Sequence, residues 1–73
     1  MIVSMPVRVA LRIEPLDGGW LLLCPCNALA QVFRSGAEAE RQARRLSRAL
    51  ATGGFRPCLS IVDRAGRTMQ VQV

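Results

Sequence analysis

The stretch that most constrains the fold is residues 35–51, which alone has the length and periodicity of a helix. Ser35 is followed three residues later by Glu38, the capping-box pattern in which each side chain accepts a hydrogen bond from a backbone N–H at the helix start. Gly53 and Gly54 follow the stretch, and glycine is common at helix ends because it adopts a left-handed conformation freely. We therefore predict one helix that begins at this cap and ends before the two glycines.

The predicted helix has two different faces. Its apolar stripe has the spacing i, i+4, i+7 and i+11 and consists of Ala39, Ala43, Leu46 and Leu50. Such a narrow stripe of small and medium side chains allows a helix to lie close against a sheet. The opposite face carries Glu38, Arg41, Arg44, Arg45 and Arg48. Glu40 precedes Arg44 by four residues and can pair with it, so a solvated helix face is one explanation for these charges.

The segments before the helix are predicted strands. Residues 7–13 alternate strictly between apolar and polar, which indicates a half-buried strand. Residues 14–19 contain proline and Asp-Gly and favour a tight turn. Residues 20–24 are apolar on both faces, so we expect this strand in the middle of the sheet, because an apolar edge strand promotes aggregation. Residues 28–33 are interpreted as a short third strand.

Two further strands are predicted after the helix, at residues 58–62 and 68–73, joined by a turn at residues 63–66 with glycine in the left-handed position. The order is therefore strand, strand, strand, helix, strand, strand. One helix covers one face of a sheet, so we predict an α+β fold with an antiparallel sheet of four to five strands. A chain of this length forms one domain, over residues 1–73, with residues 1–4 as a loose N-terminal tail.

Composition narrows the classes of function. The net charge of +5 comes from ten arginines, without lysine or histidine, and points to a polyanionic partner or to a coding bias. No window approaches the roughly 18 uninterrupted apolar residues that cross a membrane. Pro6, Arg8 and Arg12 interrupt the apolar region that a signal peptide requires. We therefore predict a cytoplasmic protein with no membrane partner.

Catalytic, cofactor and metal sites are not predicted. Without histidine, lysine or tyrosine, the usual acid–base groups are limited to five carboxylates. Helix capping, ion pairing on the helix and turn formation account for these five acidic residues. Cys24, Cys26 and Cys58 could offer three thiolates, but structural zinc prefers a wider spacing of the first two and a fourth ligand. We interpret the cysteines as small buried side chains and predict no enzyme activity.

Three short motifs suggest a family. They are Gly19-Trp20 at a strand start, Val32-Phe33-Arg34-Ser35 before Glu38-Ala39, and Val62-Asp63-Arg64-Ala65-Gly66-Arg67 in a late hairpin. Together they resemble small bacterial proteins of domain of unknown function family 2188, over roughly residues 7–68. The chain departs from that pattern in its Leu-rich second strand and in a longer segment after the helix. The resemblance supports the fold and implies no activity.

Two candidate surfaces follow from these predictions. The sheet face that the helix leaves uncovered is too apolar for free solvent, and its candidate self-association residues are Ala10, Leu21, Leu23 and Val62. The candidate polyanion-binding residues are Arg34, Arg41, Arg44, Arg45, Arg48 and Arg56. We predict a small binding or accessory module that forms a homodimer and acts on a protein partner. The alternative is a nucleic-acid-binding protein that uses the arginine-rich helix face.

Overall fold

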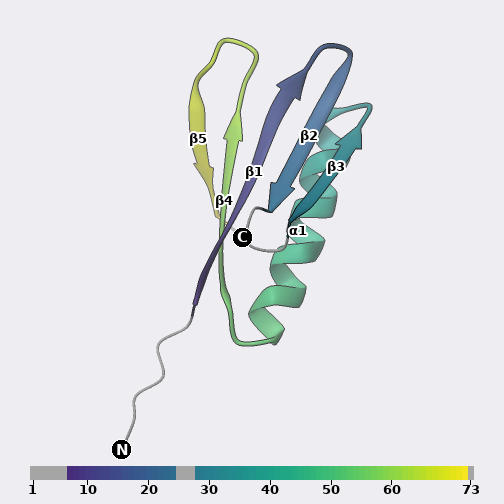
Figure 1. Cartoon of the computed structure of the whole chain (residues 1–73). Coiled ribbons are helices and arrows are strands. Elements are labelled where there is room, and N and C mark those ends of the chain that lie inside the picture. The colour runs from purple at the N-terminus through teal and green to yellow at the C-terminus, as the bar shows by residue number, and fades with distance from the viewer. Residues whose placement is uncertain (1–6, 25–27, 73) are drawn as a thin grey trace, which may run out of the picture.

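The computed structural model describes residues 7–24 and 28–72 and has an α+β fold (Figure 1). Its elements are β1 (Arg8–Leu16), β2 (Gly19–Cys24), β3 (Leu29–Phe33), α1 (Gly36–Thr52), β4 (Arg56–Val62) and β5 (Thr68–Val71). The predicted order of five strands and one helix is confirmed, as is the helix on one face of the sheet. The predicted N-terminal tail at residues 1–4 lies outside the described residues.

The strands form one sheet in the order β3-β2-β1-β4-β5. Three neighbouring pairs are antiparallel, but β1 and β4 are parallel, so the prediction of an antiparallel sheet is wrong at its centre. Two chain reversals make β3 run in the same direction as β1. The helix then carries the chain back along the sheet, and β4 begins again in the direction of β1, the crossover that parallel pairing requires.

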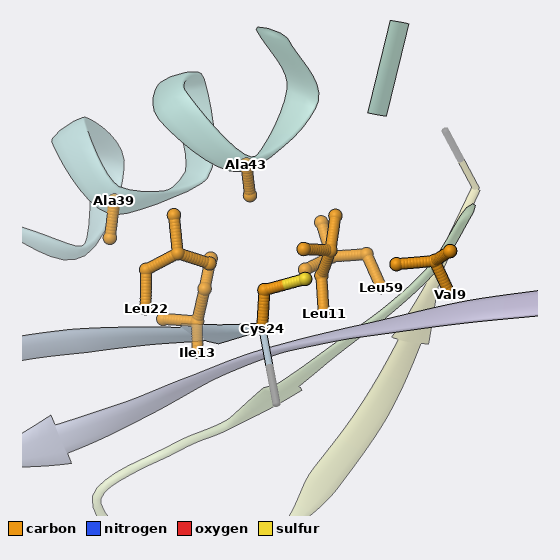
Figure 2. Close-up of a cluster of buried hydrophobic side chains, with 8 residues drawn as sticks. All are labelled: Val9, Leu11, Ile13, Leu22, Cys24, Ala39, Ala43 and Leu59. Atoms are coloured by element: carbon orange, nitrogen blue, oxygen red, sulfur yellow. The ribbon is translucent and has the colours of Figure 1, made fainter. Parts of the chain in front are cut away.

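The hydrophobic core lies between α1 and the sheet (Figure 2). Its buried members are Val9, Leu11, Ile13, Leu22, Cys24, Ala39, Ala43 and Leu59. Ala39 and Ala43 are fully buried, and their short side chains allow the helix to approach the strands closely. Leu46 and Leu50 pack against this cluster and complete the predicted stripe. Ser47 is also buried, which the stripe did not predict, and its hydroxyl donates a 2.8 Å hydrogen bond to the Ala43 carbonyl oxygen.

Both predicted helix ends are confirmed. The Ser35 hydroxyl accepts a 3.1 Å hydrogen bond from the backbone N–H of Glu38, which satisfies one of the free donors of the first turn. At the other end, Gly54 has a φ of 89°, and its N–H donates a 3.1 Å hydrogen bond to the Ala51 carbonyl oxygen. This left-handed residue turns the chain out of the helix and into β4.

Because β1 and β4 are parallel, the β1–β2 and β4–β5 turns lie at the same end of the sheet, here called the turn end (Figure 1). The Arg64 guanidinium donates hydrogen bonds to the carbonyl oxygens of Leu16 (3.0 Å) and Gly19 (3.2 Å) and lies 5.0 Å from the centre of the Trp20 ring. A Cβ at Gly36 would come within 3.2 Å of this ring, and Phe33 lies opposite Trp20 in the β2–β3 register. Residues from all three sequence motifs therefore meet in one structural cluster.

The β4–β5 turn contains the predicted left-handed glycine, Gly66, with a φ of 84°. One carboxylate oxygen of Asp63 accepts 2.9 Å hydrogen bonds from the backbone N–H groups of Ala65 and Arg67. These bonds hold the turn in a fixed shape and present Arg64 to the neighbouring β1–β2 turn.

Candidate functional site

The first candidate surface is the sheet face turned away from α1, here called the open face. Side chains alternate along a strand, so the neighbours of buried Leu11, Ile13 and Leu22 point to this face. The structure places all four predicted self-association residues on it: Ala10, Leu21, Leu23 and Val62. Ala10 is exposed, and the other three are half-buried.

Leu21 and Leu23 are part of a larger apolar area on the open face. In the β2–β3 register, Leu21 lies opposite Val32 and Leu23 lies opposite Ala30. Val32 is 69% exposed on the edge strand β3. The apolar area therefore extends over two strands to the β3 edge of the sheet.

An ion pair occupies the centre of the open face. Arg12 and Glu14 are two residues apart on β1, and their side chains approach to 3.1 Å between Nε and Oε2. In the β1–β2 register, Leu23 lies beside Arg12 and Leu21 lies beside Glu14. This pair was not predicted from the sequence, although the spacing of two residues on a strand places both side chains on one face.

The second candidate surface is the arginine-rich side of α1. Arg41, Arg45 and Arg48 are exposed. Arg44 forms the predicted pair with Glu40, in which its Nε and Nη2 donate to the same carboxylate oxygen at 3.1 and 3.0 Å. Its Nη1 also donates a 3.0 Å hydrogen bond to the carbonyl oxygen of Gln72, so this guanidinium is already committed within the fold.

The remaining two predicted arginines lie at opposite ends of α1. Arg34 directly precedes the N-cap Ser35, whereas Arg56 begins β4 after the helix has ended. A helix of 17 residues is about 25 Å long. One compact site cannot contain both side chains, so the six predicted arginines do not form a single site.

A groove of about 630 Å³ lies between the C-terminal half of α1 and strands β4 and β5. Arg48 from the helix and Arg56 from β4 both line it, and we call it the arginine groove. Its apolar lining includes Pro57, Leu59 and Val71. None of its described lining residues is acidic. The structure thus brings together two of the six predicted arginines from different elements.

Potential metal ligands are not grouped in the described part of the chain. Within it, no three His, Cys, Asp or Glu residues lie so that they could hold a metal ion. Cys24 is buried, Cys58 is half-buried, and Cys26 lies outside the described residues. The predicted lack of enzyme activity, cofactor and metal stays a prediction. In the same part of the chain, no helix has both the length and the apolar character that a membrane span needs.

Comparisons of this chain with protein-family models, with curated proteins and with solved structures find no match. The resemblance to domain of unknown function family 2188 therefore stays a prediction.

Proposed function

We propose that this protein is a non-catalytic binding module that works as a homodimer, formed by packing the open faces of two copies against each other. The observation that carries the proposal is the open face itself. It combines an apolar area on β2 and β3 with a central ion pair, and α1 covers only the other side of the sheet. An uncovered apolar sheet face is typical of an interaction surface.

The central ion pair favours a second copy as the occupant. In a symmetric dimer the same surface serves both partners, so it must complement itself. With a two-fold axis between Arg12 and Glu14, perpendicular to β1, each Arg12 faces Glu14 of the other copy. The charges then match across the interface, and the flanking Leu21 and Leu23 side chains are withdrawn from water.

The open face is large enough for such a dimer. Five strands spaced about 4.8 Å apart, each contributing about six residues, cover roughly 24 by 20 Å. Two such faces bury about 1,000 Å² in total, the lower limit for a specific interface. A small domain buries only about 60% of its unfolded surface, so the additional burial also stabilises the fold. Because α1 packs on the other face of the sheet, the helices of both copies lie on the outside of this dimer and remain accessible to a protein partner.

The test is the molar mass in solution, measured by light scattering after gel filtration. The unmodified chain should have twice its own mass of 8.0 kDa. Val62→Arg and Ala10→Arg each place a charge on the open face and should give the monomer mass. Ala10 is exposed, so its substitution leaves the core intact. Ala65→Arg adds the same charge in the β4–β5 turn and should stay dimeric.

Two results would contradict the proposed dimer. The first is a monomer mass for the unmodified chain at concentrations near 1 mM, where an interface of this size should be occupied. The second is an unchanged dimer mass for both Val62→Arg and Ala10→Arg, with amide spectra that show folded protein. In that case the protein self-associates through another surface.

A further inference from the structure

We infer that the arginine groove binds the phosphodiester backbone of a nucleic acid. This inference goes beyond self-association and does not depend on it. Arg48 and Arg56 come from different elements, line the same groove and are both exposed. Among the described residues, neither of them forms an ion pair. Two free guanidinium groups at one groove form an anion-binding arrangement, because each can bind phosphate through two parallel hydrogen bonds.

Arg8 does not belong to this pair, although it is the register partner of Arg56. Arg8 adjoins buried Val9 and therefore points to the open face, and it is not among the residues that line the groove. We therefore do not count Arg8 among the phosphate ligands. Arg56 lines the groove from the part of β4 that has no described neighbouring strand on its outer side.

Specific contacts hold the walls of the groove in place. Arg44 connects them: its guanidinium binds Glu40 on its own helix and the carbonyl oxygen of Gln72 at the end of β5. This contact fixes the distance between the helix and the strand at one end of the groove. Because Arg44 is occupied in this way, we do not count it among the phosphate ligands.

Pro57 explains why the groove is open at its other end. The Arg56 N–H donates a 2.8 Å hydrogen bond to the Val7 carbonyl oxygen, toward β1. Backbone groups alternate along a strand, so the nitrogen of Pro57 faces away from β1, where proline has no N–H to offer a partner strand. Accordingly, the β4–β5 register ends at Leu59 and Val71, and β4 continues beyond it without a described neighbour on that side.

The chemistry of the groove favours contacts to the backbone of the nucleic acid over contacts to its bases. Its described lining contains no aromatic residue on which a base could stack. Gln70 and Gln72 supply neutral amides, and the arginines supply charge. Arginine contacts to phosphate position a protein on nucleic acid without reading its sequence. We therefore expect binding that is independent of sequence and strongly dependent on salt.

The salt dependence can be estimated from two phosphate contacts, by Arg48 and Arg56. Each contact contributes about −0.9 to the slope of log affinity against log salt concentration, so we expect a slope of about −1.8. Raising the salt from 50 to 200 mM should then weaken binding about 12-fold. The measurement is fluorescence anisotropy of a labelled random DNA duplex of about 20 base pairs, titrated with the full chain at several salt concentrations.

Paired variants locate the binding site. Arg48→Gln with Arg56→Gln should bring the slope close to zero, so that the same change in salt has little effect on the weak binding that remains. The matched control is Arg34→Gln with Arg67→Gln, which removes the same charge from exposed residues near the turn end. This control should keep the slope of the unmodified protein. Amide spectra of both double variants establish that each is folded.

Two results would overturn the inference. If the groove variant and the turn-end control lose affinity and slope equally, the attraction is a property of net charge and the groove is not a site. If the unmodified protein does not bind the duplex at 50 mM salt, the groove does not bind nucleic acid at all. Neither result bears on the dimer, whose molar mass is measured without nucleic acid.

Discussion

The cluster at the turn end supplies a quantitative test of the fold. Arg64 joins two turns that are 45 or more residues apart in the chain, through two hydrogen bonds to carbonyl oxygens and a contact with the Trp20 ring. We assign about 0.5–1 kcal/mol to each of these partly exposed hydrogen bonds and about 0.5 kcal/mol to the cation–π contact. Arg64→Met, which keeps an apolar stem, should therefore lower the free energy of unfolding by about 1.5–2.5 kcal/mol.

That loss is large for a domain of this size, whose total stability is about 4–11 kcal/mol. The midpoint of thermal unfolding should fall by about 6–20 °C. Urea denaturation followed by circular dichroism measures the effect without using Trp20 as the probe. Arg64→Lys keeps the charge but loses the planar guanidinium, and it should recover less than half of the loss.

The matched control is Arg67→Met, in the same turn, where only backbone atoms make described hydrogen bonds. Its free energy of unfolding should change by less than about 0.5 kcal/mol, as expected for an exposed side chain. If Arg64→Met and Arg67→Met destabilise the protein equally, the contacts of Arg64 contribute nothing to the fold. The sequence motif at residues 62–67 would then need an explanation other than the contacts of Arg64.

Two further predictions concern packing and backbone conformation, and urea denaturation measures both. Ala43→Leu should destabilise the protein by about 1–3 kcal/mol because the fully buried position has no room for a larger side chain, whereas Ala37→Leu on the exposed side should change little. Equal effects would mean that the distance between the helix and the sheet does not limit the size of the side chain at position 43. Gly54→Ala should cost about 1–2 kcal/mol because φ is 89°, whereas Gly53→Ala at a φ of −81° should be neutral or slightly stabilising. A neutral Gly54→Ala would contradict this reasoning.

Local structure could be predicted from the sequence because its causes are local. The cap at Ser35, the glycine after the helix and the alternation in residues 7–13 each act within a few residues of the chain. Parallel pairing of β1 with β4 has no such signal. Parallel strands usually read as continuous apolar runs because helices cover both of their faces. Here α1 covers one face only, so β1 alternates like an antiparallel strand and its pattern does not reveal its partner.

The open face and the arginine groove differ in the same way: local patterns predict the first but not the second. Membership of the open face follows from alternation, so Ala10 and Val62 could be assigned before the strand order was known. The arginine groove depends on facts that no local pattern contains. Arg48 and Arg56 meet there because β4 inserts beside β1, β5 stops at Val71, and the helix ends above this corner of the sheet.

The two proposed interactions can take place on one dimer. If the two-fold axis lies between Arg12 and Glu14, it crosses β1 near Ile13, and three residues separate that point from the strand's end at Leu16. At about 3.3 Å per residue, each copy covers roughly 10 Å of its partner's β1 on either side of the axis. Arg56 of the groove is the register partner of Arg8 and therefore lies five residues, about 16 Å, from the axis, beyond the covered length. The same axis makes the two β1 strands antiparallel, so the two arginine grooves lie at opposite ends of the dimer and both stay open to nucleic acid.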